Sequence, residues 1–191
     1  AGTGIGAAVS RRLVAEGARV VLTGRREAPL REVGDGLGDS ALVIAGDAAD
    51  RTAIDEIAAA AVDRFGSLDV VIANAGGHRL GTALEMDDDS WHYNVRINLD
   101  TAFMTARACL PALMESRGSM VVVSSIAGLF AGPAAMGYVT TKHALIGLTR
   151  SLARDFGKHG VRVNALCPGW VRTAMADEQM DSLVERDGIT R

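Results

Sequence analysis

The chain has 191 residues, 48% of them hydrophobic and 23% charged, which is typical of a globular protein with one full-sized core. Its formal net charge is −3 and it has no basic block, which argues against nucleic acid or an anionic membrane as the main partner. Its apolar runs are too short to span a membrane. Cys109 and Cys167 fit no metal-ligand spacing, so we expect buried free thiols in the cytoplasm and no bound metal.

The first predicted feature is a glycine-rich loop that leads into a helix. The stretch 1–17, AGTGIGAAVSRRLVAEG, places three glycines before an amphipathic pattern and Gly17 at its end. Glycine lets the backbone approach a ligand closely, and the N–H groups of a helix start attract anions. Such a loop normally follows a β-strand, so we expect the first strand of the fold to be missing from the chain. A flexible glycine-rich tail is the alternative.

Five short, valine-rich apolar runs each predict a strand. Their hydrophobicity is continuous rather than alternating, which fits strands buried on both faces of a parallel sheet. Helical patterns separate them at 50–66, 88–117 and 137–158, and Pro111 should kink the second. This alternation predicts a single α/β domain with a three-layer, doubly wound parallel sheet of the Rossmann type. The five runs are 18–24, 41–47, 69–76, 119–125 and 161–167.

Ligands of such sheets bind at the carboxyl ends of the strands, so the residues there are candidates for a site. An acid about twenty residues past the glycine loop favours NAD, whereas a basic residue suits the extra phosphate of NADP. Arg25 and Arg26 stand there and Glu27 follows, so we favour NADP over NAD, with a solvated loop pair as the alternative. Asp47 ends the next run and could bind adenine or cap a turn.

Another motif is YVTTK, which places Tyr138 and Lys142 one helical turn apart. Residues i and i+4 share a helix face, so both side chains can address one point beside the sheet. A serine pair, Ser124 and Ser125, closes the strand predicted at 119–125 and faces the same side. Since a nearby ammonium favours a phenolate, we expect Lys142 to lower the pKa of Tyr138 from about 10. The alternative for Tyr138 and Lys142 is an exposed pair on a helix face. The alternative for the two serines is a cap where the strand meets a loop.

Together, these motifs resemble the classical short-chain dehydrogenase/reductase family over essentially the whole chain. The shared features are the glycine motif, the strand-ending aspartate, Asn-Asn-Ala-Gly with alanine in first place, a helix asparagine, the serine, the tyrosine–lysine pair and Pro-Gly. The matching residues are Gly4, Gly6, Asp47, Ala73, Asn74, Ala75, Gly76, Asn98, Ser125, Tyr138, Lys142, Pro168, Gly169, Val171 and Thr173. The family's opening Thr-Gly would precede Ala1.

The resemblance implies an NAD(P)-dependent oxidoreductase that transfers a hydride between nicotinamide and a ketone or secondary alcohol. Tyr138 would be the general acid/base, and Lys142 would also hold the nicotinamide ribose. Ser125 would bind the substrate oxygen, and Asn98 would help to hold a water of the proton relay. The cofactor contacts implied beyond the conserved motifs are Thr3, Ile5, Ala48, Val171 and Thr173.

The resemblance says less about the substrate. By analogy, His78 and Trp170 would lie near the mouth of the substrate site and could contact the substrate. The alternatives are an ordinary loop histidine and a tryptophan that only packs. Candidate substrates are a 3-oxoacyl thioester, a hydroxy acid and a hydrophobic ring ketone. Residues 174–191 resemble the start of a mobile lid, and we expect the family pattern to continue past them. A homotetramer or homodimer is implied, and the alternative function is a non-catalytic dinucleotide sensor or scaffold.

Overall fold

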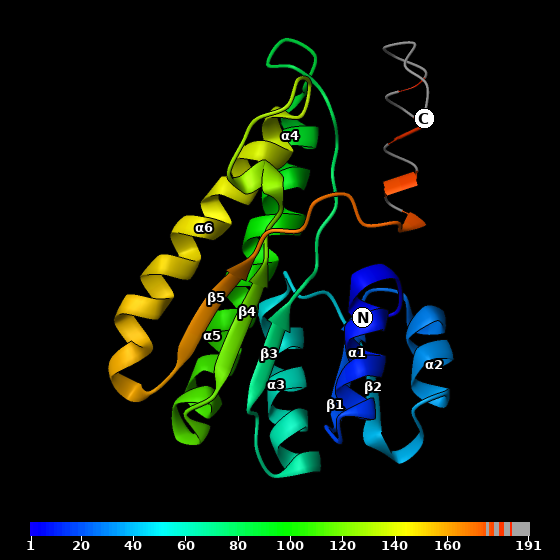
Figure 1. Cartoon of the computed structure of the whole chain (residues 1–191), viewed down its shortest axis with the longest axis vertical. Coiled ribbons are helices and arrows are strands. Elements are labelled where there is room, and N and C mark those ends of the chain that lie inside the picture. The colour runs from blue at the N-terminus through cyan, green and yellow to red at the C-terminus, as the bar shows by residue number, and fades with distance from the viewer. Residues whose placement is uncertain (175, 178–179, 182–183, 185–191) are drawn as a thin grey trace.

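The computed structural model describes residues 1–174, 176–177, 180–181 and 184, and strands alternate with helices along them (Figure 1). No helix within these residues is long and apolar enough to cross a membrane. The strands are β1 (Val20–Gly24), β2 (Ala41–Ala45), β3 (Val70–Ala73), β4 (Ser119–Val123) and β5 (Arg162–Leu166). The α-helices are α1 (Gly4–Ala15), α2 (Glu27–Asp35), α3 (Arg51–Phe65), α4 (Asp88–Asn94), α5 (Thr101–Ser116) and α6 (Met136–Phe156).

All strand pairs of the described residues are parallel, as the continuous apolar runs predict. β1 pairs with β2, and β4 lies between β3 and β5. No ladder within the described residues joins β1 to β3, so the strands form two parallel sheets instead of one continuous sheet. The α/β class and the parallel pairing of the strands are therefore confirmed.

Helices cover the strands on both sides. Figure 1 shows α3 and α5 behind β3 and β4, with α1 in front of β1. The main core cluster fills the space between β4 and its helices and contains Leu113, Met120 and Val122, all fully buried. A second cluster holds Leu22 and Leu30 between β1 and α2. Each half of the sheet therefore has a core of its own. Burying one such side chain stabilises the fold by roughly 1.5–3 kcal/mol.

The predicted helix ends rest on local signals that the structure confirms. Asp50 caps α3 because its carboxylate accepts a hydrogen bond from the Ala53 N–H at 2.9 Å. Gly66 ends the same helix at φ 87°, a left-handed conformation that glycine adopts without strain. Gly17 follows α1 at φ 88°.

The pattern at 88–117 departs from the predicted helix. The irregularity lies at a π-helix, η2 (Val95–Asp100), which separates α4 from α5. Pro111 lies inside α5, which continues to Ser116, so the helix assignment is not interrupted there. A π-turn inserts one residue into a helix and is common at functional sites. Here it carries the buried Asn98 to the end of β3.

Both cysteines are free thiols, as expected. Burial raises the pKa of the Cys109 thiol to about 11, with a smaller effect from the charge of Asp55, so Cys109 is an inert core residue. Cys167 is only half-buried, so the expectation of a buried thiol is wrong for this residue. The described residues contain no group of histidine, cysteine and acidic side chains arranged to hold a metal ion.

Candidate active site

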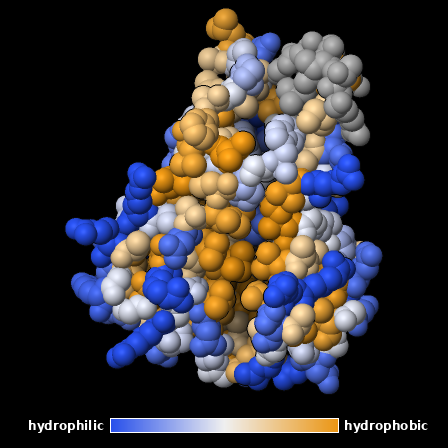
Figure 2. All heavy atoms as spheres, viewed as in Figure 1, coloured by the Kyte–Doolittle hydropathy of each residue, from blue (hydrophilic) through white to orange (hydrophobic). Residues whose placement is uncertain are grey.

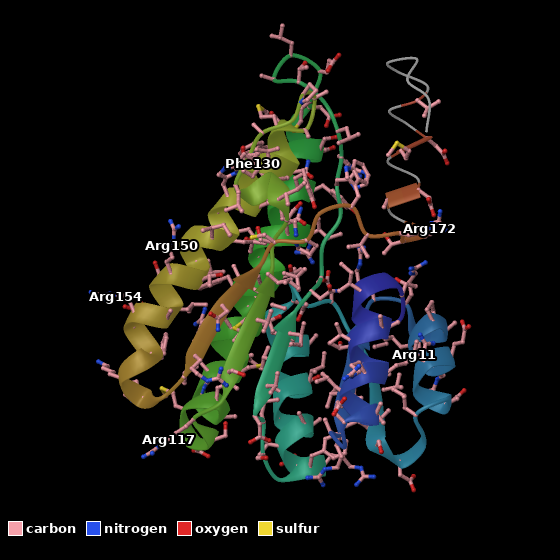
Figure 3. The ribbon with its side chains drawn as sticks, in the orientation of Figure 1. Arg11, Arg117, Phe130, Arg150, Arg154 and Arg172 are labelled. Atoms are coloured by element: carbon pink, nitrogen blue, oxygen red, sulfur yellow. The ribbon has the colours of Figure 1, made fainter. Side chains whose placement is uncertain are left out.

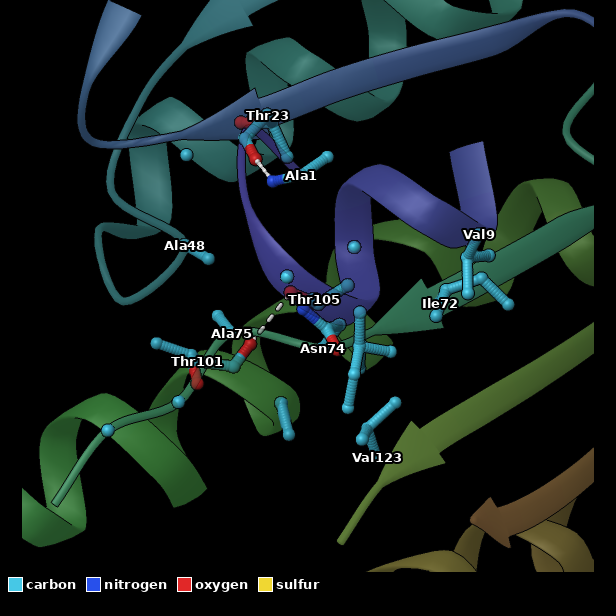
Figure 4. A pocket seen from close by; sticks show the side chains of 18 of the residues that line it. Ala1, Val9, Thr23, Ala48, Ile72, Asn74, Ala75, Thr101, Thr105 and Val123 are labelled. Carbon is cyan, nitrogen blue, oxygen red and sulfur yellow. Dashed lines mark hydrogen bonds between the residues drawn. The ribbon is translucent and has the colours of Figure 1, made fainter. Parts of the chain in front are cut away.

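A cavity of about 1450 Å³ opens at the carboxyl ends of the strands and continues into the gap between β1 and β3. Figure 2 shows hydrophobic residues along this groove, and Figure 4 shows Val9, Ile72 and Val123 around the cavity. All the residues predicted to bind the cofactor line it, as do Ser125 and Trp170. Asn98 and His78 are not among the lining residues. The cofactor candidates are Thr3, Gly4, Ile5, Gly6, Arg25, Arg26, Asp47, Ala48, Asn74, Ala75, Gly76, Tyr138, Lys142, Pro168, Gly169, Val171 and Thr173.

The glycine loop turns tightly at one wall of this cavity. Gly4 opens α1 at φ +52°, where a side chain would also lie 3.1 Å from Thr173. A Cβ at Gly6 would lie 3.0 Å from the backbone of Ala1 and 3.1 Å from Asn74 Nδ2. Thr3 makes no capping hydrogen bond through its side chain, so the first N–H groups of α1 are available to a ligand. The loop therefore fits an anionic group such as a pyrophosphate.

Ala1 lies against the end of β1. Its backbone nitrogen donates a hydrogen bond to the Thr23 carbonyl at 2.6 Å (Figure 4). Thr23 Oγ1 is a buried oxygen without a hydrogen-bond partner among the described residues. Its hydrogen-bonding capacity is therefore unused in this part of the cavity.

Positive charge gathers at the ends of β1 and β2. Arg25 and Arg26 are exposed, and Arg26 precedes the first residue of α2. Arg96 donates a hydrogen bond to Asp47 at 2.6 Å, and the Ala49 N–H donates a second at 3.0 Å. Partial burial opposes ionisation of Asp47, but these hydrogen bonds and the charges of Arg96 and Arg25 outweigh it and lower its pKa. Asp47 is thus a charged acceptor beside free guanidinium groups.

Asn98 supports the turn after β3 without lining the cavity. It is fully buried, and its amide bonds the Gly77 backbone at both N–H and C=O. A Cβ at Gly76 would lie 2.9 Å from Asn98 Oδ1 and 3.5 Å from Lys142 Nζ. Only glycine at position 76 therefore lets the turn approach both side chains.

Ser125, Tyr138 and Lys142 meet where β4 ends and α6 begins. The Ser125 hydroxyl lies close enough to the Tyr138 phenol to lower its pKa. Lys142 Nζ lies 5.5 Å from the centre of the Tyr138 ring and donates a hydrogen bond to the Val123 carbonyl at 3.0 Å. Ser124 instead donates to the Lys142 carbonyl at 2.8 Å, so it joins the strand to the helix. The tyrosine and the lysine face the same point beside the sheet.

The expected lowering of the Tyr138 pKa is wrong for this structure. Burial raises the pKa of the phenol, and the nearby Ser125 hydroxyl opposes this only in part. Lys142 is itself 5% exposed, and desolvation lowers the pKa of its ammonium to about 8. The expectation rested on the charge of Lys142 alone. Desolvation of Tyr138, which only the folded chain reveals, favours the neutral phenol.

The mouth beside these groups is apolar. Trp170 is 59% exposed and lines the cavity, and Phe130 is 71% exposed near the start of α6 (Figure 3). His78 packs edge to face against Tyr138, with ring centres 6.1 Å apart. Other large exposed hydrophobic residues near the mouth are Ile126, Leu129, Met136 and Val171. Met175, Leu183 and most other residues of the predicted lid lie outside the described residues.

Two residues of this region escaped the sequence analysis. Arg96 holds Asp47 from the other side of the cavity, and Asn94 is fully buried beside the segment 77–79. Both belong to a helical stretch, and the spacing of its apolar residues does not mark either residue as functional. The polar Asn94 at a buried helix position was the available signal, because buried amides need specific partners.

The family model described as short chain dehydrogenase matches residues 1–183 of the chain. Protein MoaE of Klebsiella aerogenes is 45% identical over 194 residues, which cover 99% of this chain and 73% of that protein. Meso-2,3-butanediol dehydrogenase of Serratia marcescens is 33% identical, and the match covers 100% of this chain and 78% of that protein.

Solved structures give the same result. A crystal structure of a variant actinorhodin polyketide ketoreductase with NADPH superposes with a TM-score of 0.94 at 32% sequence identity. The superposition covers 99% of this chain and 75% of that one. The similarity therefore extends through the glycine loop, the strand ends and the start of α6.

Proposed function

Because the chain belongs to the short-chain dehydrogenase family, we propose that this oxidoreductase is an NADPH-dependent reductase of a ketone, with Tyr138 as the proton donor. The observation that carries the proposal is the meeting of Ser125, Tyr138 and Lys142 at one wall of the cavity. The proposal treats residues 1–191 as part of one dinucleotide-binding domain.

When bound, the nicotinamide cofactor supplies the hydride, and the residues of the chain handle the proton. A ketone that gains a hydride becomes an alkoxide, so a proton must be available next to it. The Tyr138 hydroxyl donates this proton, and the Ser125 hydroxyl orients the substrate oxygen through a hydrogen bond. Lys142 holds the cofactor ribose, and its ammonium favours the anion that Tyr138 becomes after donation.

The protonation states of the site suit Tyr138 as a proton donor at neutral pH. Burial raises the pKa of Tyr138, so the phenol carries its proton at neutral pH and can act as an acid. The pKa of Lys142 is about 8, so this lysine remains mainly an ammonium at neutral pH. Oxidation of an alcohol requires Tyr138 to lose its proton first, which burial opposes.

NADPH is the proposed cofactor because the end of β1 presents cationic side chains without a neighbouring acid on that strand. Arg25 and Arg26 line the cavity at the place where an adenosine ribose is bound in this type of sheet. Two exposed guanidinium groups suit a dianionic 2′-phosphate, which is absent from NAD. Asp47 remains a candidate acceptor for the adenine amine.

The mouth of the cavity suits a largely apolar carbonyl compound. Phe130 and Trp170 expose aromatic surface, and both line the cavity together with Tyr138. The relatives include a butanediol dehydrogenase and a polyketide ketoreductase, and both names denote compounds with more than one oxygen. We therefore assign the substrate to hydrophobic ketones with a second oxygen, with 3-oxoacyl thioesters among them.

Absorbance of NADPH in the presence of a panel of such ketones tests this proposal. Wild-type protein should consume NADPH, and Tyr138→Phe should bind NADPH normally but turn over at least about 1000-fold more slowly, since it loses its proton donor. Robust turnover by Tyr138→Phe would remove Tyr138 from the mechanism. NADPH binding without turnover of any ketone would favour the alternative, a dinucleotide sensor.

Two further features belong to the proposal. The free thiols Cys109 and Cys167 support a reducing compartment such as the cytoplasm. Phe103 on α5 is 44% exposed, which suits a homodimer or homotetramer that packs through α5 and α6. Light scattering of the purified protein measures its mass directly.

A further inference from the structure

The segment 77–79, which follows β3, has no helix or strand assigned to it, yet its backbone is held by side chains. The side chains of Asn94 and Asn98, two asparagines one helical turn apart, pair with the backbone of Gly77 and Arg79. The Gly77 N–H donates to Asn98 Oδ1 at 3.2 Å, and Asn98 Nδ2 donates to the Gly77 carbonyl at 2.9 Å. The Arg79 N–H donates to Asn94 Oδ1 at 3.1 Å, and Asn94 Nδ2 donates to the Arg79 carbonyl at 3.0 Å.

We call these four hydrogen bonds the amide ladder. The backbone N–H and C=O groups of residues 77 and 79 thus both bond to side chains of the same helical stretch. Each asparagine also donates Nδ2 to the carbonyl four residues before it, Ser90 for Asn94 and Asn94 for Asn98, both at 3.0 Å. Both side chains are fully buried, so water does not compete for the hydrogen bonds of their amide oxygen and nitrogen atoms.

The amide ladder reaches Tyr138 by two contacts. His78, between the two paired residues, packs edge to face on the Tyr138 ring at 6.1 Å. Gly137, directly before Tyr138, lies so close to Asn94 that a Cβ there would be 2.7 Å from Asn94 Nδ2. Asn94 therefore contacts both the loop that carries His78 and the first turn of α6.

From this geometry we propose that Asn94 is a positioning residue for the reaction, which orients Tyr138 through the segment 77–79 and its His78. This inference rests on the proposed function, since it gives Tyr138 the role of proton donor. Asn94 is not among the residues that line the cavity, so its effect on cofactor affinity should be small. Without these bonds, the helix and the loop could shift relative to each other. The side-chain amides of Asn94 and Asn98 each bond both the N–H and the C=O of one loop residue, which fixes their relative position.

The first experiment measures the amide ladder without any activity. Hydrogen exchange, followed by NMR, should show the Arg79 amide protected in the wild type and exchanging at least about tenfold faster in Asn94→Leu, because that variant lacks its acceptor. The Gly77 amide should stay protected, since Asn98 still bonds it. Unchanged exchange at Arg79 would overturn the ladder whatever the enzyme does.

The second experiment measures the effect on turnover with NADPH and a ketone that the wild type reduces. Asn94→Leu should lower kcat roughly 10- to 100-fold, because small misplacements of reacting groups cost that much, while the Kd for NADPH stays within about twofold. Thr149→Val is the matched control: it removes a buried hydroxyl, which bonds the Leu145 carbonyl at 2.7 Å on α6, far along the helix from Tyr138. That control should lose stability but keep kcat.

A double-mutant cycle identifies the route. If Asn94 acts through His78, then kcat of His78→Ala/Asn94→Leu should equal that of His78→Ala alone within about twofold. Multiplied losses would overturn the route through His78, and an unchanged kcat in Asn94→Leu would overturn the positioning role. If the wild type reduces no ketone at all, the proposed function fails, while the exchange measurement still reports on the amide ladder.

Discussion

Lys142 gives the sharpest test of how burial sets the electrostatics of this site. Its side chain is 5% exposed, and desolvation lowers the pKa of its ammonium from 10.5 to about 8. The difference, 10.5 minus about 8, is about 2.5, which corresponds to about 3 kcal/mol between the folded and unfolded chains. This is the amount by which folding disfavours the charged lysine.

The sign follows from proton binding. Below about pH 8, Lys142 is charged in both states, so the full cost of burying the ammonium is present. Between about pH 8 and 10.5, the folded protein releases the proton while the unfolded chain keeps it. The unfolded state then binds more protons, so the free energy of unfolding rises with pH across this window.

The measurement is urea unfolding of the cofactor-free protein at several pH values across that window. Relative to Lys142→Met, which has no titrating group at this position, the wild type should gain up to about 3 kcal/mol. Lys158 is exposed at the end of α6, so Lys158→Met is the control and should follow the wild type in parallel. Parallel curves for wild type and Lys142→Met would refute the account of a desolvated ammonium.

Three further outcomes are expected. Arg25→Ala and Arg26→Ala should each raise the KM for NADPH about tenfold or more while changing that for NADH little; equal changes would contradict the 2′-phosphate contact. Gly6→Ala should weaken dinucleotide binding measured by calorimetry, because its Cβ would lie 3.1 Å from Asn74 Nδ2; wild-type affinity would contradict that close approach. Alcohol oxidation should speed up as pH rises, since burial raises the pKa of Tyr138, and a flat profile would argue against Tyr138 as the base.

Much of the fold was predictable because its signals are local. Each valine-rich run contains a strand of the structure, and a capping aspartate and a glycine at φ 87° bound α3 as expected. The one-turn spacing of Tyr138 and Lys142 placed both on one helix face, since an α-helix repeats every 3.6 residues. These features depend on the backbone preferences of a few neighbouring residues.

The irregular stretch between α4 and α5 shows where local reasoning fails. Pro111 is the only strong helix breaker in that pattern, yet α5 continues through it and the π-turn falls at 95–100. The π-turn coincides with the bonds of Asn98 to the backbone of Gly77, a partner 21 residues away. No propensity of the helix sequence encodes such a partner.

The sequence by itself determined the five strands, both ends of α3, and the set of side chains that could serve a dinucleotide-dependent reaction. The tertiary structure decided how those side chains behave. It left Tyr138 only partly exposed and buried Lys142, which raised the pKa of the phenol and lowered that of the ammonium. It also placed Asn94 and Arg96 against partners far away in the chain. The reason is physical: desolvation and long-range hydrogen bonds depend on what surrounds a group in space, and only the folded chain supplies those surroundings.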